Sequence, residues 1–225
     1  MKIHTFLTGI ANTHLIEISR GIIIVDAGTP GQAKRILNKV ETLGYAPQEV
    51  RLIFLTHGHL DHAGSSMDLK RATGAPIALH RADARLVATP YLMTPPGRNA
   101  LIESSMRLVR PLFRLIRMEA FAPDIWLEDG QSLQEFGLSA SVVQTPGHTR
   151  GSVSIAFEDG AMIVGDAILN LFRVALPLVW EDTDATVKSA KKIIALKPRV
   201  SYTGHGRAFD ARALAEFSAR RFGNN

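Results

Sequence analysis

The 225-residue sequence contains no cysteine, and this absence removes several explanations at the outset. Disulfide scaffolds are excluded, and any metal site must be built from histidine and carboxylate side chains instead of thiolates. The sequence also lacks an apolar run long enough to span a membrane. No signal-peptide core follows Met1, so a cytoplasmic location is the expectation.

Aromatic residues are scarce as well, at 7% of a chain whose formal net charge is +5. A basic chain can bind nucleic acid or an anionic membrane. Surfaces that bind nucleic acid usually combine lysine and arginine clusters with aromatic side chains, and here the one basic cluster lies in an apolar helical stretch. We therefore expect a small, neutral or anionic organic substrate and not nucleic acid. The hydrophobic content of 46% is typical of a globular chain.

What the sequence does contain is a dense group of metal-ligating side chains. Four of them fall within six residues, and they are His57, His59, Asp61 and His62. They follow the apolar run 52–56, which is typical of a buried strand. Neutral imidazole suits zinc and iron, and a carboxylate adds a harder ligand. We predict that the chain leaves this strand in a turn and folds the four side chains around one point.

Three later positions supply further ligands of the same kinds. His148 lies in a Thr-Pro-Gly-His-Thr segment, Asp166 follows the apolar run 161–164 through a glycine, and His205 lies between two glycines. Glycine lets the backbone turn sharply or approach a ligand closely. Each position is a weak signal alone, but together with the first motif they make seven ligands, which is enough for two metal ions.

The order of these motifs resembles that of the metallo-β-lactamase superfamily. The matching segments are 56–62, 145–149, 165–166 and 204–206, and residues 25–28 are similar to the early motif of the family. The resemblance implies an α/β fold, a four-layer αββα sandwich with the metal ions at one edge. It also implies that residues 1–225 form one domain of this type.

The resemblance further implies a role for each ligand. It divides them between two divalent cations: His57, His59 and His148 for the first, Asp61, His62 and His205 for the second, and Asp166 between the two. Zinc is the expected metal, with iron or manganese as alternatives. Asp26 would lie behind the ligands and orient them, as outer hydrogen-bond partners do. The alternative for Asp26 is a turn-forming role before Ala-Gly.

This ligand set predicts a dinuclear hydrolase that cleaves an ester, thioester or lactone bond with a metal-bound hydroxide. Asp61 is the candidate catalytic residue, because a carboxylate ligand can also accept or relay a proton. A serine nucleophile in a Gly-x-Ser-x-Gly motif and a cysteine nucleophile are both absent from the sequence.

Departures from known subfamilies leave the substrate open. Glyoxalase II enzymes share the ligands but carry a long helical region after the last histidine, whereas 20 residues follow His205 here. The β-lactamases usually lack the bridging aspartate represented by Asp166. Acyl-homoserine lactonases share all seven ligands and a mid-chain insertion, yet they typically have a tyrosine where this chain has residues 168–170.

Three alternative functions remain: a mononuclear iron oxidoreductase of the persulfide-dioxygenase type, a phosphodiesterase and a β-lactam hydrolase. His59 argues against the flavodiiron oxidoreductases, which carry glutamate there.

Periodicity and turn residues predict the order of the elements. Strands are expected at 2–7, 13–19, 21–25, 52–56, 76–79, 125–127, 138–144, 152–157, 161–164 and 199–202. Helices are expected at 31–43, 65–73, 183–196 and 211–222. Each half of the chain has an apolar strand that leads to an aspartate and a later strand that leads to a histidine-glycine loop, which favours a sandwich of two related halves.

Residues 89–123 fit neither half, and we interpret them as a helical insertion. Four arginines recur at helical spacing opposite a broad apolar face, and Pro111 predicts a kink or two short helices. The arginines are Arg107, Arg110, Arg114 and Arg117; the apolar residues are Leu101, Leu108, Leu112, Leu115 and Ile116. The insertion could cover an edge of the sandwich or form the wall of a substrate pocket, with Leu108, Leu112, Phe113 and Ile116 as lining and Arg107 or Arg114 as an anchor. Two further interpretations are a contact between copies of a homo-oligomer and a contact of residues 99–121 with a membrane surface.

Overall fold

Two β-sheets form the centre of the computed structural model, which describes residues 2–89, 104 and 118–223. The first sheet has six strands in chain order. Its first three strands are antiparallel, and the third to sixth run parallel. These strands are β1 (Lys2–Thr8), β2 (Ala11–Ile18), β3 (Gly21–Val25), β4 (Val50–Phe54), β5 (Ile77–His80) and β6 (Ile125–Leu127).

The second sheet has five strands in the order β13-β12-β9-β8-β7, with β12 parallel to β9. Its strands are β7 (Ala140–Gln144), β8 (Val153–Phe157), β9 (Ala161–Gly165), β12 (Val200–Thr203) and β13 (Phe209–Asp210). A separate antiparallel pair, β10 (Leu169–Asn170) and β11 (Val174–Ala175), lies between β9 and β12 in the chain.

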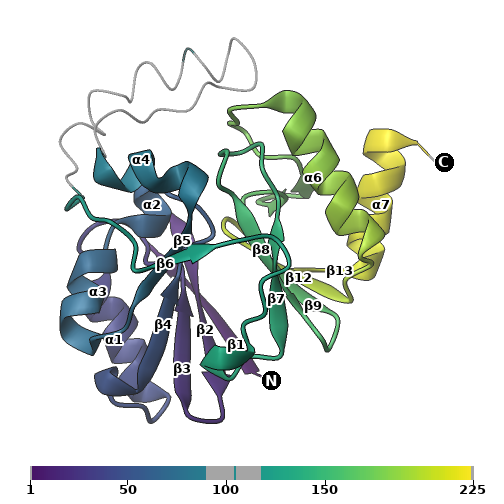
Figure 1. Ribbon diagram of the computed structural model, residues 1–225. Helices are drawn as coiled ribbons and strands as arrows, with labels where there is room; N and C mark the ends of the chain where they lie inside the picture. The colour runs from purple at the N-terminus through teal and green to yellow at the C-terminus, as the bar shows by residue number, and fades with distance from the viewer. Residues whose placement is uncertain (1, 90–103, 105–117, 224–225) are drawn as a thin grey trace.

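Helices cover the outer face of each sheet (Figure 1). The first group is α1 (Ala33–Thr42), α2 (Leu60–Ala63), α3 (Ser66–Thr73) and α4 (Ala84–Ala88), and the second is α6 (Thr183–Ala195) and α7 (Ala211–Phe222). Short 3₁₀ turns are η1 (Pro47–Glu49), η2 (Arg81–Asp83) and η4 (Gln134–Phe136). Both long helices of the second group begin at an aspartate that accepts a hydrogen bond from a backbone N–H of the first turn, at Asp182 and Asp210.

Three hydrophobic cores fill the spaces between the four layers. Strand β3 shows how alternation assigns side chains to them, because successive residues of a strand point to opposite faces. Ile22 and Ile24 pack toward the first group of helices, whereas Ile23 and Val25 pack between the sheets. The third core lies between the second sheet and helices α6 and α7. The predicted four-layer αββα sandwich is therefore confirmed.

The elements that the sequence failed to predict are short. They are α2, α4, β10, β11 and β13, none longer than five residues, where periodicity carries little signal. After β4 the chain bends at Thr56 and His57, and Leu60–Ala63 then form the single helical turn α2, which the sequence did not predict.

Most of the predicted insertion at 89–123, including its arginines and apolar face, lies outside the described residues. At its described end, Met118 and Phe121 are buried in the core beneath the first group of helices, and the Phe121 N–H donates to the Val87 carbonyl over 3.1 Å. Among the described residues, no helix combines the length and apolarity that crossing a bilayer requires.

Candidate metal centre

The seven predicted ligands follow strands that end at the same edge of the sandwich. Strand β4 leads to His57, β7 to His148, β9 to Asp166 and β12 to His205. The two sheets are joined at this edge by a hydrogen bond from the Val153 N–H to the Thr56 carbonyl over 2.8 Å. Residues far apart in sequence are therefore brought together, as is usual for sites at the carboxyl ends of strands in α/β folds.

All seven side chains lie in one cluster. Three overlapping groups have ligand atoms within 4.8 Å of one another, namely His57 with His59 and His148, His57 with His62 and Asp166, and Asp61 with His62 and His205. We call His57, His59 and His148 the buried triad, because little of any of the three is exposed. We call Asp61, His62 and His205 the open triad, because the Asp61 and His205 side chains are 20% and 18% exposed.

In the buried triad the ring nitrogens face one another. The Nδ1 atom of His59 lies 3.1 Å from Nε2 of His57 and 2.9 Å from Nε2 of His148. His148 reaches this position with its other nitrogen fixed, because Nδ1 lies 2.8 Å from the Val179 carbonyl oxygen and donates to it. Nε2 of His148 therefore carries a lone pair that points into the cluster.

The open triad is arranged similarly around a carboxylate. Nε2 of His205 lies 3.3 Å from Nε2 of His62 and 3.3 Å from Oδ2 of Asp61. His205 Nδ1 donates to the Ile10 carbonyl over 2.9 Å, and His62 Nδ1 donates to Oδ2 of Asp26 over 2.8 Å. Both rings are thus held from behind with Nε2 directed inward, which is the usual arrangement of a metal-ligating histidine.

Asp166 lies between the two triads. Its Oδ2 atom is 3.4 Å from Nε2 of His148 and 3.3 Å from Nε2 of His205, so one oxygen faces a member of each triad. Its Oδ1 atom is buried and has no hydrogen-bond partner among the described residues. A buried carboxylate oxygen without a partner is costly unless a cation compensates it. Imidazole nitrogens and carboxylate oxygens gathered in this way fit the binding of divalent metal, and Asp166 faces both triads.

Asp26 stands behind the open triad, as the outer role proposed for it requires. It is fully buried, and besides His62 it accepts hydrogen bonds from the backbone N–H and the hydroxyl of Thr56. The Thr56 hydroxyl in turn lies 3.1 Å from Nδ1 of His57. Asp26 has a φ of +62°, a left-handed conformation that aspartate tolerates better than most residues.

Asn12 was not singled out from the sequence, yet it fixes the loop that carries His205. Its side-chain amide donates to the carbonyls of Thr203 and Gly206, each over 2.9 Å, and its backbone N–H donates to the Gly204 carbonyl over 2.7 Å. A polar residue near the start of a strand gives no sequence signal for this role, because its partners lie about 190 residues further along the chain.

Gly204 is required by the close packing of the cluster. A Cβ atom at this position would overlap with Oδ1 of Asp166 and lie 2.7 Å from Cε1 of His62. The loop before His205 therefore passes directly against two of the ligands, and any larger residue would displace them.

Burial and neighbouring charge shift the pKa values of the two triads in opposite directions. Burial lowers the pKa of His59 to about 3, and it also lowers the pKa of His57 and His148. Burial opposes the charged form in the open triad too, but the nearby carboxylates outweigh it. Asp26, Asp166 and Asp61 raise the pKa of His62 to about 9, and Asp166 and Asp61 raise that of His205 to about 11.

The two carboxylates of the cluster are held in the ionised form. Burial alone would raise the pKa of each, but the positive charges of His62 and His205 lower the pKa of Asp61 and Asp166 below the ordinary value. In the metal-free protein, protons on these two histidines therefore balance the carboxylates, and a bound cation would take over that role.

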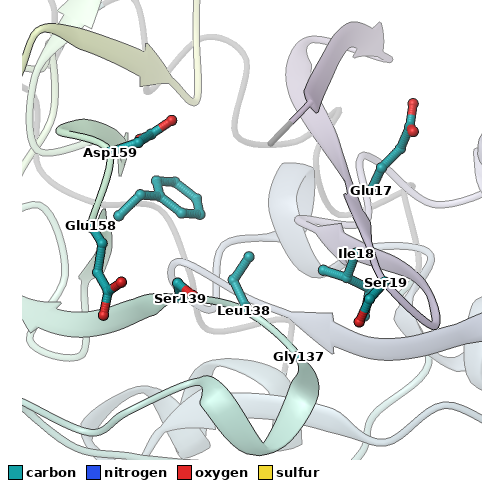
Figure 2. A pocket seen from close by; sticks show the side chains of 9 residues that line it. Glu17, Ile18, Ser19, Gly137, Leu138, Ser139, Glu158 and Asp159 are labelled. Atoms are coloured by element: carbon teal, nitrogen blue, oxygen red, sulfur yellow. The ribbon is translucent and has the colours of Figure 1, made fainter.

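A cavity of about 400 Å³ lies at the end of the sandwich opposite the ligand cluster. Figure 2 shows its lining, which combines Ile18 and Leu138 with the carboxylates of Glu17, Glu158 and Asp159. Two of these carboxylates already have partners, since Glu17 contacts His4 over 2.7 Å and Asp159 contacts Arg199 over 2.9 Å. This cavity contains none of the predicted ligands.

Comparison with known proteins identifies the class to which this fold and site belong. The family model described as the metallo-beta-lactamase superfamily matches residues 7–205, and the chain belongs to that superfamily. It is 26% identical over 230 residues to the probable metallo-hydrolase YflN of Bacillus subtilis, a match covering 91% of this chain and 83% of YflN. The chain is also 31% identical over 148 residues to the hydroxyacylglutathione hydrolase GloC of Haemophilus influenzae, covering 64% of this chain and 60% of GloC.

The fold is shared with solved structures as well. The BLEG-1 B3 metallo-beta-lactamase superposes with a TM-score of 0.78 over the full length of both chains, at 23% sequence identity. At that identity the likeness concerns the fold. The family match and the relatives support a metal-dependent hydrolase, and the His/Asp cluster is its candidate site of metal binding.

Proposed function

We propose that this protein is a dinuclear metal-dependent hydrolase that cleaves an ester, thioester or lactone bond of a small organic substrate. The observation that carries the proposal is the position of Asp166, whose Oδ2 atom faces His148 of the buried triad and His205 of the open triad at nearly equal distances. A single carboxylate between two sets of nitrogen and oxygen ligands is the arrangement that two adjacent divalent ions need.

Two divalent cations held here would act as Lewis acids on a carbonyl oxygen and bring the pKa of water close to neutrality. The histidines supply neutral nitrogen ligands, and the residues behind them fix the ring orientation. His148, His62 and His205 each use Nδ1 for a hydrogen bond, so that Nε2 is the atom presented to a cation.

Substrate approach is expected from the side of the open triad. Asp61 and His205 are the most exposed of the seven ligands, whereas His57 and His62 are fully buried. Asp61 is ionised and reaches solvent, so its carboxylate is placed to accept a proton from the attacking water and pass it to the leaving group.

Exposed apolar side chains near this side support an organic acyl substrate. Ile10 accepts the hydrogen bond of His205 through its carbonyl while its side chain is exposed. Leu171 and the fully exposed Phe172 follow Asn170, whose backbone bonds to His205 and Arg207 on the same loop. Small-ligand sites are mostly apolar with a few polar anchors, and these apolar side chains could supply part of such a site.

The test combines metal analysis with a substrate screen. Purified protein is assayed for bound metals and oxygen consumption. It is then assayed against aryl esters, acyl thioesters of different chain length, lactones, phosphodiesters and β-lactams. We expect close to two metal ions per chain and the highest kcat/KM on an ester, thioester or lactone, with activity lost on chelation and restored by added metal. Asp159→Asn, which alters a surface carboxylate bonded to Arg199, serves as the control variant with unchanged activity.

Two other outcomes would replace the proposal. One iron per chain with oxygen consumption would identify a mononuclear oxidoreductase. If a phosphodiester or a β-lactam is turned over fastest, the same site cleaves a phosphodiester or β-lactam bond instead of an ester, thioester or lactone bond.

A further inference from the structure

Asp83 is a buried carboxylate whose hydrogen bonds go to Gly58, Thr149 and Gly151 and to none of the seven ligands. It lies at the end of η2, between β5 and α4. Its Oδ2 atom accepts hydrogen bonds from the Gly58 N–H over 2.9 Å and from the Thr149 hydroxyl over 2.7 Å. Its Oδ1 atom accepts from the Gly151 N–H over 2.7 Å. Three donors thus converge on one side chain.

The three donors belong to the two loops that carry the buried triad. Gly58 lies between His57 and His59, in the loop that leaves the first sheet. Thr149 directly follows His148, and with Gly151 it belongs to the loop that links β7 and β8 of the second sheet. Asp83 therefore joins the loops from the two sheets at the position where their histidines must meet.

The surrounding structure leaves little freedom in this connection. A Cβ atom at Gly151 would lie 2.6 Å from Cγ of Asp83, so the loop backbone packs directly against the carboxylate. The Thr149 hydroxyl is also 2.7 Å from Oγ of Ser152, which accepts the Thr149 N–H over 3.1 Å. The loop after His148 is thus braced internally as well as against Asp83.

The chemistry of this position indicates more than space filling. Burial raises the pKa of Asp83 to about 6, although the bonds from Thr149, Gly58 and Gly151 oppose the shift. Among the described residues, no lysine or arginine forms an ion pair with it. A buried carboxylate is costly by itself, but an apolar side chain of the same size would leave these three buried donors without an acceptor. What only a carboxylate offers here is two oxygens that accept from three donors at once.

We propose that Asp83 is a positioning residue that sets the metal affinity of the buried triad by holding the His57–His59 loop and the His148 loop at a fixed separation. The proposal rests on the two-metal centre proposed above. It assigns no comparable role to Asp83 toward the open triad, whose Asp61 and His62 lie on α2 and whose His205 loop is held by Asn12.

The test measures each triad separately. The His205→Ala substitution removes a ligand of the open triad and leaves the buried triad intact. The His148→Ala substitution removes a ligand of the buried triad and leaves the open triad intact. Adding Asp83→Asn to each keeps the side-chain size but replaces one acceptor oxygen with an NH₂ group that faces N–H and O–H donors. The dissociation constant for Zn²⁺ is measured by competition with a chromophoric chelator, together with the melting temperature of the metal-free protein.

We expect Asp83→Asn to weaken Zn²⁺ binding by roughly 10- to 100-fold in the His205→Ala background, the usual effect of losing an outer partner. Binding in the His148→Ala background should stay close to its starting value. The matched control is Asp124→Asn at the other end of β5, where the carboxylate accepts from the Ile77 N–H and contacts Lys70 but touches no ligand loop. It should change neither dissociation constant.

A purely structural role predicts a lower melting temperature with both Zn²⁺ constants unchanged, and that result would overturn the proposal. If Asp83→Asn does not fold, Thr149→Val removes a single donor and should weaken the buried triad several-fold in the same background; an unchanged constant would again overturn it. A wild-type chain that binds no metal would overturn the proposed function as well. If the wild-type chain binds two ions and Asp83→Asn has no effect on Zn²⁺ binding, the proposed function stands and only the role of Asp83 is contradicted.

Discussion

The buried triad and the open triad use similar side chains in opposite environments. His57, His59 and His148 are enclosed and have lowered pKa values, so they are unprotonated and ready to bind a cation near neutral pH. His62 and His205 share their site with carboxylates that raise their pKa values, so protons occupy the open triad until a cation displaces them. One cluster therefore contains an enclosed, neutral half and a solvent-facing, charged half.

In the proposed hydrolase, this difference suits the two triads to different roles, metal retention and substrate access. The buried half can retain its cation tightly, because its ligands need not lose protons and its loops are tied together by Asp83. The open half faces solvent through Asp61 and His205, where substrate and water can enter. Asp166 couples the halves because the same oxygen faces His148 and His205.

The largest effect is expected from removing that coupling. Asp166→Ala deletes the ligand that both triads share, so metal content should fall from two ions per chain to one or fewer. The rate should fall by roughly a thousandfold or more, because metal assistance contributes several kcal/mol to such reactions. Metal analysis and kcat/KM on the best substrate measure the change. A variant that keeps two metal ions and full activity would show that the two triads do not share Asp166.

The metal affinities of the two triads should depend differently on pH. Between pH 6 and 8, His62 and His205 are protonated in the metal-free protein, since their pKa values of about 9 and about 11 lie above this range. A cation must displace those protons, so the affinity of the open triad should rise with pH by about tenfold per pH unit for each proton released. The buried triad should change little, because the pKa of His59 is lowered to about 3.

Calorimetric titration in buffers of different ionisation enthalpy counts the protons released by each binding event. The His205→Ala and His148→Ala variants assign the counts to the buried and the open triad. Equal proton release at the two triads would remove the electrostatic distinction between them.

A smaller, selective effect is expected from Asn12→Ala. The substitution removes two hydrogen bonds to the carbonyls of Thr203 and Gly206 and loosens the loop that carries His205. Zn²⁺ binding by the open triad should weaken by about tenfold, at the lower end of the range for outer partners, while the buried triad is unaffected. Measured in the same two backgrounds, Asn12→Ala and Asp83→Asn should give opposite patterns. Equal weakening of both triads by Asn12→Ala would mean that the loop acts on the cluster as a whole.

Local patterns were sufficient to predict most of the fold. Strand β3 and helix α7 follow the predicted ranges 21–25 and 211–222, because alternation and helical periodicity are properties of a single segment. The choice of candidate ligands was also accessible, because four of them are packed into residues 57–62 and the others lie beside glycines after strand-like runs. The short elements α2, β10 and β13 were missed because they contain too few residues to show a period.

The ligand types, the layered α/β fold and the kind of chemistry that five histidines and two aspartates can support could all be predicted from the motifs and periodicity of the chain. Which ligands face solvent, how Asp83 and Asn12 contact the ligand loops, and how close His148 comes to His59 depend on the packing of the two sheets. The physical reason is that burial within one element follows from its own periodicity. A distance between two loops instead depends on strand register and on how two sheets pack, as the bond between Val153 and Thr56 illustrates.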